Sequence, residues 1–210
     1  MLIKRGAEAD IYLIEWYGRQ AISKVRKRKQ YMHEMLDREI RMKRTLHEAE
    51  MINMAKRAGV TTPLLYFVDP INAEIVMQYI KGELARDLIS QGFGWIAEMM
   101  GIYTARLHAR DIVHGDLTTS NFIVYDDGID TPRLVLIDFG LSFYSSRLED
   151  KAVDVRLIKE VMSSAHADVF DDAFKKFTQG YSSILGDDYA RKVLKKVKEI
   201  EQRGRYARVV

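Results

Sequence analysis

Hydrophobic residues near the start of the chain follow first a strand-like pattern and then a helix-like one. Between residues 10 and 29, β-branched and aromatic residues stand on both sides of Tyr17-Gly18-Arg19, which predicts two strands joined by a turn. From residue 35 to residue 57, apolar residues recur at helical spacing without Pro or Gly, until Gly59 ends the run. The pattern therefore predicts a hairpin followed by one long amphipathic helix.

Two short apolar runs follow this helix, at residues 63–69 and 73–80, with Pro70 and Asn72 between them. Runs of this length, bounded by turn-forming residues, predict another pair of strands. The first eighty residues therefore predict a small sheet that carries one long helix, and we expect a hinge at residues 77–82.

The remainder of the chain has a mainly helical pattern. The elements expected there are helices over 83–90 and 95–110, a hairpin from the apolar runs 122–125 and 134–140, and three helices from about residue 149 onward, separated near Ala167 and Gly186. We therefore expect an α+β fold: a small β-sheet lobe with one long helix at 1–80, and a mainly helical lobe at 81–210.

The composition is compatible with this plan and adds limits on location. The chain has 210 residues, of which 47% are hydrophobic, enough for a sizeable core. It has no cysteine, so no disulfide framework is expected. No apolar run approaches the roughly 20 residues of a membrane span, and the N-terminus lacks the apolar core of a signal peptide. We expect a cytoplasmic protein with no membrane partner.

The formal charge of +3 is small, but the basic residues are clustered. Residues 22–44 contain nine Lys and Arg against three acids, and residues 191–208 contain eight against two. Such runs usually form solvated helix faces. The alternative is contact with a phosphate-rich partner such as RNA.

The segment that starts at Val113 brings His114, Asp116 and Asn121 into one short loop. Asp, Ser, Thr and Asn also stabilise ordinary turns, so the loop by itself does not identify a site. After the predicted hairpin comes Asp138-Phe139-Gly140, and together these residues match the kinase pattern H-x-D-x-x-x-x-N followed by D-F-G. In that chemistry Asp116 receives the proton of the acceptor, and Asn121 and Asp138 hold Mg²⁺ against the ATP phosphates.

Two further parts of a kinase site occur upstream in the expected order. Lys24 lies on the second strand of the first hairpin, where a lysine pairs with nucleotide phosphates. Glu48 and Glu50 both lie on the long helix that supplies the partner of this lysine, and the apolar neighbours Ala49 and Ile52 favour Glu48. The order of these partial motifs, each on the element type that it needs, favours a catalytic site over ordinary turn chemistry.

Two weaker features complete the expected nucleotide site. Gly6 stands where a protein kinase carries a glycine-rich loop over the phosphates, but as a single glycine it gives a less flexible approach. Met77 and Tyr79 belong to the linker that would line the adenine pocket.

Several positions depart from ordinary protein kinases. Gly115 replaces an arginine, Thr118 stands where a lysine contacts the transferred phosphate, and no A-P-E motif follows Gly140. We expect slow phosphorylation of other proteins, water as a credible acceptor, and control by partners rather than by activation-loop phosphorylation. His114 is expected to brace the loop, and Asp154 either holds its backbone or lies on the surface.

Six segments carry a resemblance to a known family, from about residue 6 to residue 155. They are GAEADIY, ISKVRKRKQY, LDREIRMKRTLHEAEM, VHGDLTTSN, LIDFGLS and EDKAVDV. Together they resemble the small atypical kinases of the KEOPS complex, the PRPK family. The resemblance implies a minimal bilobal protein-kinase-like fold, an ATP and Mg²⁺ site with Glu48 as the helix glutamate, and Ser/Thr autophosphorylation or ATP hydrolysis.

The resemblance also implies partners. Members of the family act in an assembly that makes threonylcarbamoyladenosine (t6A) on tRNA, in which the threonylcarbamoyl transferase subunit docks on the kinase C-lobe and a small regulatory subunit binds the N-lobe. The chain resembles the stand-alone form found in archaea rather than a fusion with the transferase. In this family the basic C-terminal tail is associated with tRNA modification, so contact between tRNA and the tail is a hypothesis.

Two other function classes remain as alternatives. A small-molecule phosphotransferase of the aminoglycoside type shares the H-G-D and D-x-G plan, but usually has a larger helical lobe than the roughly 70 residues after Gly140 provide. A non-catalytic scaffold would not need the metal-binding and proton-handling residues, all of which are present.

Overall fold

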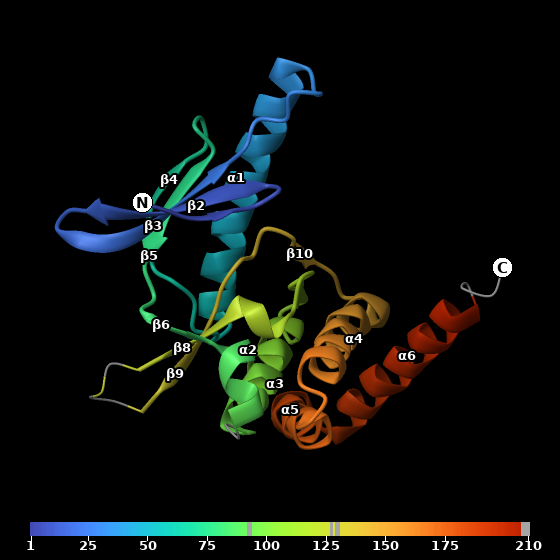
Figure 1. The fold of residues 1–210 in the computed structure, drawn as a ribbon. Coiled ribbons are helices and arrows are strands. Elements are labelled where there is room, and N and C mark those ends of the chain that lie inside the picture. The colour runs from blue at the N-terminus through green and yellow to red at the C-terminus, as the bar shows by residue number, and fades with distance from the viewer. Residues whose placement is uncertain (92–93, 127, 129–130, 207–210) are drawn as a thin grey trace.

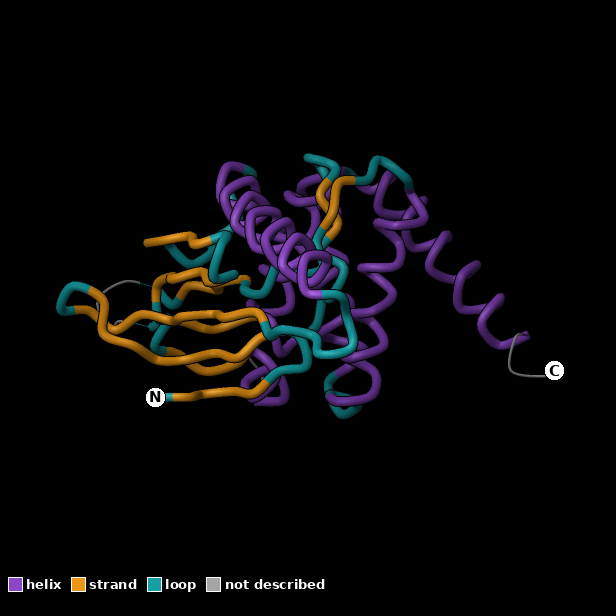
Figure 2. The backbone as a smooth tube through the Cα atoms, turned by 90° about the horizontal axis from the view of Figure 1, so that it is seen from above, coloured by secondary structure: helices purple, strands orange, loops and turns teal. Residues whose placement is uncertain are grey.

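The fold, taken from a computed structural model, is described for residues 1–91, 94–126, 128 and 131–206. A β-sheet with one long helix forms the N-terminal region, and helices dominate the C-terminal region (Figure 1). Seen from above, the strands gather on one side of the molecule and most helices on the other (Figure 2). The expected α+β fold is confirmed.

The N-terminal sheet is antiparallel, with five strands in the order β1-β2-β3-β5-β4. Its strands are β1 Leu2–Arg5, β2 Ala9–Trp16, β3 Arg19–Arg26, β4 Leu65–Asp69 and β5 Glu74–Gln78. Tyr17 and Gly18 connect β2 to β3 with φ angles of 48° and 75°, which is the left-handed geometry of a tight two-residue hairpin turn. Both predicted strand pairs are confirmed, whereas β1 adds an edge strand that the sequence pattern did not reveal.

Helix α1, Glu34–Arg57, crosses one face of this sheet (Figures 1 and 2). Ala49 packs against Ile75 and Met77 of β5, which fixes the helix to the sheet. One turn further on, Met51 and Ile52 enter the main hydrophobic core that the C-terminal helices also share. The helix therefore belongs to both regions of the molecule, and the expected lobe boundary at 80/81 stays a prediction.

A second, three-stranded sheet follows, in the order β6-β8-β9, and the prediction of a helix over 83–90 is wrong in its first part. The elements are β6 Gly82–Leu84, helix α2 Ala85–Leu88, a short 3₁₀ helix Ile89–Gln91, β8 Phe122–Tyr125 and β9 Arg133–Leu136. A Cβ atom on Gly82 would lie 2.1 Å from the carbonyl oxygen of Val124. Close pairing with β8 therefore overrides the local helical pattern.

The remaining elements form the helical region: α3 Gly94–His108, β7 Ile112–Val113, a short 3₁₀ helix Thr119–Asn121, β10 Phe143–Tyr144, α4 Leu148–Ala165, α5 Phe170–Leu185 and α6 Asp187–Tyr206. The three predicted helices after residue 149 are confirmed. α3 and α5 cross closely at Gly101 and Gly180, where a Cβ atom on either glycine would lie 2.0 Å from a backbone oxygen of the other helix. Among the described residues, every helix is too short or too polar to cross a bilayer.

Candidate active site

A cleft of about 230 Å³ lies between the N-terminal sheet and the loops that lead into the helical region. The residues that line it are Lys4, Gly6, Ala7, Glu8, Ala9, Ile11, Lys24, Arg26, Arg44, Asp116, Asp138, Gly140 and Leu141. Four of the sequence-predicted site residues, Gly6, Lys24, Asp116 and Asp138, are among them. The fold thus brings together residues that are more than one hundred positions apart in the chain.

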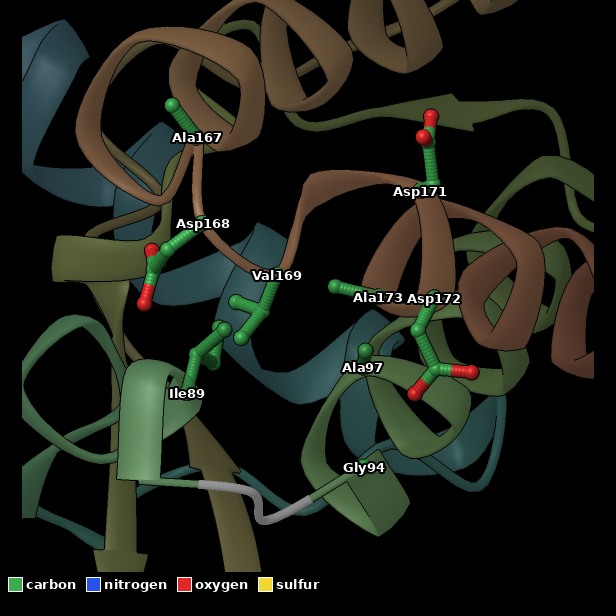
Figure 3. Close-up of a pocket in the computed structure, with 9 residues that line it drawn as sticks. All are labelled: Ile89, Gly94, Ala97, Ala167, Asp168, Val169, Asp171, Asp172 and Ala173. Carbon is green, nitrogen blue, oxygen red and sulfur yellow. The ribbon is translucent and has the colours of Figure 1, made fainter.

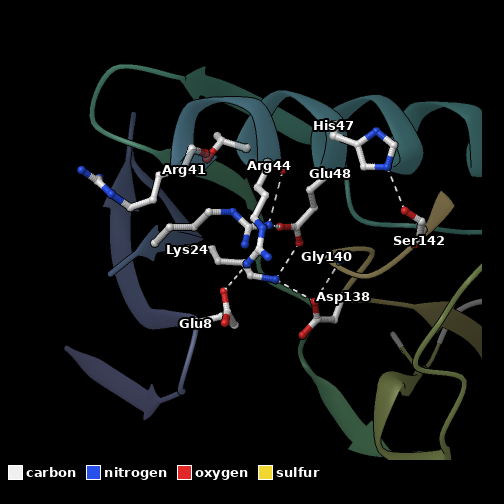
Figure 4. A network of polar contacts seen from close by, with 11 residues as sticks. Glu8, Lys24, Arg41, Arg44, His47, Glu48, Asp138, Gly140 and Ser142 are labelled. Carbon is white, nitrogen blue, oxygen red and sulfur yellow. Dashed lines mark hydrogen bonds and ion pairs between the residues drawn. The ribbon is translucent and has the colours of Figure 1, made fainter. Parts of the chain in front are cut away.

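Lys24 is the centre of an ionic cluster in this cleft (Figure 4). Its Nζ donates to Oε1 of Glu48 at 2.6 Å and to Oδ1 of Asp138 at 2.7 Å. Burial by itself would lower the pKa of Lys24, but the Glu48 and Asp138 carboxylates outweigh it and raise that pKa. For Asp138, burial opposes ionisation, yet Lys24 lowers the pKa of the carboxyl. These shifts favour the charged forms of Lys24 and Asp138.

Strand pairing and helix packing put the members of this cluster in place. Lys24 lies opposite Ile11 of β2 and Ile75 of β5, so the middle of the sheet holds its backbone. Glu48 is 1% exposed and lies beside Ala49, which packs on the same sheet. Glu50, the alternative partner, is exposed and approaches the Tyr144 hydroxyl instead. The structure thus places Glu48 against Lys24, as the apolar neighbours of Glu48 indicated.

The loop from His114 to Asn121 holds Asp116 on the other side of the cleft. Nδ2 of Asn121 donates to the Asp116 carbonyl oxygen at 2.7 Å and to its Oδ2 at 3.0 Å, which orients the carboxylate. Asp154 of α4 is 2% exposed and accepts from the backbone amides of His114, at 2.6 Å, and Gly115, at 2.9 Å. The first of the two roles considered for Asp154 is therefore confirmed.

His114 and Gly115 explain why this loop keeps its shape. The His114 ring is completely buried and packs edge-on against Phe139, with ring centroids 5.0 Å apart. Burial lowers the pKa of His114, so the ring is neutral and braces the loop, as expected. Gly115 has a φ of 80°, and a Cβ atom there would lie 2.3 Å from the Leu141 carbonyl oxygen. This close approach leaves no room for the arginine that ordinary kinases carry.

Gly6 makes a tight turn at the rim of the cleft, where its amide donates to the carbonyl oxygen of Ala9 at 3.0 Å. Met77 is 8% exposed and packs with the small cluster under α1, and Tyr79 is half-buried after β5. Among the described residues, neither Met77 nor Tyr79 lines the 230 Å³ cleft. Their role in an adenine pocket stays a prediction.

Four charged residues that line the cleft were missed by sequence reasoning: Lys4, Glu8, Arg26 and Arg44. Glu8 accepts from Nζ of Lys29 at 3.0 Å and from Nη1 of Arg44 at 2.6 Å, and the hydrogen bond from Lys29 is the main cause of its lowered pKa. It thereby ties the Gly6 turn to α1. Within a run of basic residues each of these arginines looks solvated, but the two-residue spacing of Arg26 from Lys24 could have indicated a shared face.

A larger cavity, of about 330 Å³, lies in the helical region near the start of α5 (Figure 3). Its lining residues are Ile89, Gly94, Ala97, Ala167, Asp168, Val169, Asp171, Asp172 and Ala173. None of the kinase-motif residues belongs to this lining. The smaller cleft therefore remains the candidate active site, because it combines buried charge with those motifs.

The donor atoms of the cleft fit a magnesium ion. Asp138 uses Oδ1 for its bonds with Lys24 and Gly140, and Asn121 uses Nδ2 for its bonds with Asp116. These contacts leave Oδ2 of Asp138 and Oδ1 of Asn121 as oxygen donors. Mg²⁺ is usually held by one or two protein oxygens together with nucleotide phosphates, and this pair supplies that number.

Comparisons with known proteins agree with this geometry. A family model described as RIO domain matches residues 13–168. The chain is 38% identical over 215 residues to the KEOPS complex subunit Bud32 of Pyrococcus abyssi, covering 98% of this chain and 96% of that protein. It is 40% identical over 205 residues to a probable bifunctional tRNA threonylcarbamoyladenosine biosynthesis protein of Methanocaldococcus jannaschii, of which it spans 37%.

Solved structures with a similar fold include the Rio2 kinase of Chaetomium thermophilum in an ADP/Mg²⁺-phosphoaspartate complex. The TM-score is 0.67 at 15% sequence identity, over 97% of this chain and 70% of that one. This structural similarity concerns the fold alone, and the sequence matches assign the chain to a family. The chain therefore belongs to the RIO domain family of atypical kinases and, within it, to the family of the KEOPS complex subunit Bud32.

Proposed function

We propose that this protein is an ATP- and Mg²⁺-dependent atypical Ser/Thr kinase with ATPase activity, and that it works as a KEOPS subunit in the t6A modification of tRNA. The observation that carries the proposal is the cleft itself, where Lys24, Glu48 and Asp138 form one ionic cluster opposite Asp116. The names of two relatives, a KEOPS subunit and a t6A biosynthesis protein, support the biological setting.

Lys24 would pair with the α- and β-phosphates of ATP, and Glu48 would aim it. Asp138 and Asn121 would hold Mg²⁺ through their remaining oxygens, and the bound ion neutralises charge on the phosphates. Because the pKa of Lys24 is raised and that of Asp138 is lowered, both groups carry the charges that these roles need. The turn at Gly6 would cover the phosphates, and Met77 and Tyr79 would flank the adenine.

Asp116 would accept the proton of the attacking hydroxyl. Asn121 donates to Oδ2 of this carboxylate, so Oδ1 would be the atom that accepts the proton of a nucleophile. The acceptor would be a Ser or Thr hydroxyl, on this chain or another, or a water molecule. Thr118 in place of a lysine, together with the short path from Gly140 to α4, favours water or an intramolecular hydroxyl over a bound peptide.

We further propose that the threonylcarbamoyl transferase subunit docks on the helical C-lobe, residues 81–210, and that a small regulatory subunit binds the N-lobe, residues 1–80. The basic stretch at 191–208, most of which lies on α6, would contact tRNA. The protein would act in the cytoplasm.

Radiolabelled ATP tests the catalytic part of this proposal. Phosphate release and label on the chain would be measured for wild type, Asp116→Asn and Asp138→Asn, alone and with the transferase subunit and tRNA. Wild type should turn over ATP, and each variant should lose at least about 100-fold, because a group that acts on transition-state charge is removed. Asp188→Asn, an exposed change at the start of α6, is the matched control and should keep wild-type turnover.

The outcomes separate the possible functions. Turnover that depends on the partners supports an ATPase role, and label on the chain supports a kinase role. Equal turnover by wild type and Asp138→Asn, or no turnover in any mixture, contradicts the proposal. Efficient phosphorylation of an added aminoglycoside would instead support a small-molecule phosphotransferase.

A further inference from the structure

Arg26 follows Lys24 by two residues on β3, so both side chains leave the same face of the strand. Arg26 is 6% exposed, although it stands in a run of basic residues. Its Nη2 donates to Oε2 of Glu48 at 2.5 Å and lies 3.4 Å from the carbonyl oxygen of Arg44, one turn earlier on α1. A buried arginine thus cross-links the strand of Lys24 to the helix of Glu48.

Both carboxylate oxygens of Glu48 are engaged, and by different cations. Oε1 accepts from Lys24 and Oε2 from Arg26. Lys24 is also bound to Asp138, so its position depends on two acids in two different segments. An arginine keeps its charge at any physiological pH and has several donors in one plane. The bond from Arg26 therefore fixes the orientation of Glu48 independently of Lys24.

The Arg26–Glu48 pair also touches the segment that carries Asp138. A Cβ atom built on Gly140 would lie 3.5 Å from Nη2 of Arg26 and 3.5 Å from Oε2 of Glu48. The backbone of Gly140 is therefore packed against the pair, so that β3, α1 and the Asp138-Phe139-Gly140 segment meet there. The pair thus lies where the three segments that supply Lys24, Glu48 and Asp138 come together.

We propose that Arg26 is a positioning residue for phosphoryl transfer, which holds Glu48 and α1 against the cleft when Lys24 turns from Asp138 to the phosphates of ATP. This inference rests on the kinase or ATPase function proposed above. It accounts for activity without a phosphorylated activation loop, because α1 is already fixed from β3. Arg26 acts through Glu48 and does not itself contact the nucleotide.

A mutant cycle between Arg26 and Glu48 tests this role, with kcat and KM for ATP measured on the full chain. Arg26→Gln should lower kcat by about tenfold or more and leave KM within about threefold, because a misplaced Glu48 weakens contacts made in the transition state. In a Glu48→Gln background, the same Arg26 change should have no further effect. Arg28→Gln is the control: Arg28 is largely exposed, pairs with Glu34, and should keep wild-type kcat.

Arg26→Lys provides a second test if Arg26→Gln does not fold. It keeps a cation for Glu48 but cannot also reach the Arg44 carbonyl, so kcat should fall about threefold in the wild-type background and not at all with Glu48→Gln. Additive effects of the two changes, or a rise in KM alone, would mean that Arg26 binds ATP directly and would overturn the proposal. So would unchanged kcat in both Arg26 variants. If the wild-type protein itself does not turn over ATP, the result contradicts the proposed kinase or ATPase function instead.

Discussion

On the sheet side of the cleft, charged side chains hold one another, whereas on the helical side one buried carboxylate, that of Asp154, holds the backbone of the loop 114–121. Lys24 can exchange one carboxylate for another group, since it already divides its bonds between Glu48 and Asp138. Asp116 stands on a loop whose amides are fixed by the buried Asp154. Under the proposed function, the difference teaches that Lys24 would change partners during the reaction, while Asp116 would stay in place.

The largest expected effect comes from removing Asp154. Asp154→Ala leaves the amides of His114 and Gly115 buried without acceptors, at about 1–3 kcal/mol each, so the free energy of unfolding should fall by about 4 kcal/mol. Urea unfolding followed by circular dichroism measures it. Glu160→Ala, on the same helix but in an exposed pair with Arg156, should change stability by less than about 0.5 kcal/mol. A loss of less than about 1 kcal/mol for Asp154→Ala would contradict the conclusion that Asp154 holds the backbone of this loop.

A smaller loss is expected at the crossing of α3 and α5, which supports the helical side. Gly101→Ala would place a Cβ atom 2.0 Å from the carbonyl oxygen of Phe177, so the helices must separate, at about 3 kcal/mol. Gly94→Ala, at the start of the same helix, meets the Lys176 side chain at an ordinary 3.7 Å and should be neutral or slightly stabilising. Thermal unfolding compares the two variants directly. Equal melting temperatures would mean that α3 and α5 move apart at this crossing at little cost in stability.

The smallest effect concerns pH. Burial lowers the pKa of His114, so the folded state binds fewer protons than the unfolded state once the pH falls below the ordinary histidine value of 6.5. Stability should therefore decrease as the pH falls from 7 to 5, by at most about 1.4 kcal/mol per pH unit for this group.

His114→Asn should flatten that part of the stability–pH curve, as measured by urea unfolding at several pH values. His33→Asn, at an exposed position just before α1, is the comparison for the removal of a histidine. Burial also lowers the pKa of His166, and that contribution remains in all three proteins. An unchanged slope in His114→Asn would show that the ring is protonated in the folded state.

Elements with strong local signals could be predicted from the sequence. The β2–β3 hairpin follows from its turn residues, and α1 follows from a long helical period without Gly or Pro. β1 and β6 are short and depend on partners: β1 pairs only with β2 in the sheet order, and β6 with the distant β8. Such strands are specified by tertiary pairing, which no local pattern records.

Some residues of the candidate site could likewise be predicted from the sequence, and others could not. The motif residues Lys24, Asp116 and Asp138 could be placed in one cleft because their spacing matches a known arrangement of chemistry. Arg26 was not placed there, because the neighbouring arginines and lysines suggest a solvated run and only its two-residue spacing from Lys24 indicates a shared face. The sequence does not show which side chain in a basic run is buried. The fold does, because it shows which acidic residue that side chain contacts.

The 24-residue helix α1 is anchored near its end, where Met51 and Ile52 enter the main core, and its first three residues are exposed. Contacts from Glu8 to Arg44 and from Arg26 to Glu48 hold the helix further along, so a rotation about Ile52 would have to strain them. With a rise of 1.5 Å per residue, Glu34 lies about 27 Å from Ile52 and Glu48 about 6 Å. A displacement of roughly 4 Å at Glu34 would then shift the Glu48 carboxylate by about 1 Å, so that a coarse movement at the surface becomes a fine adjustment beside Lys24.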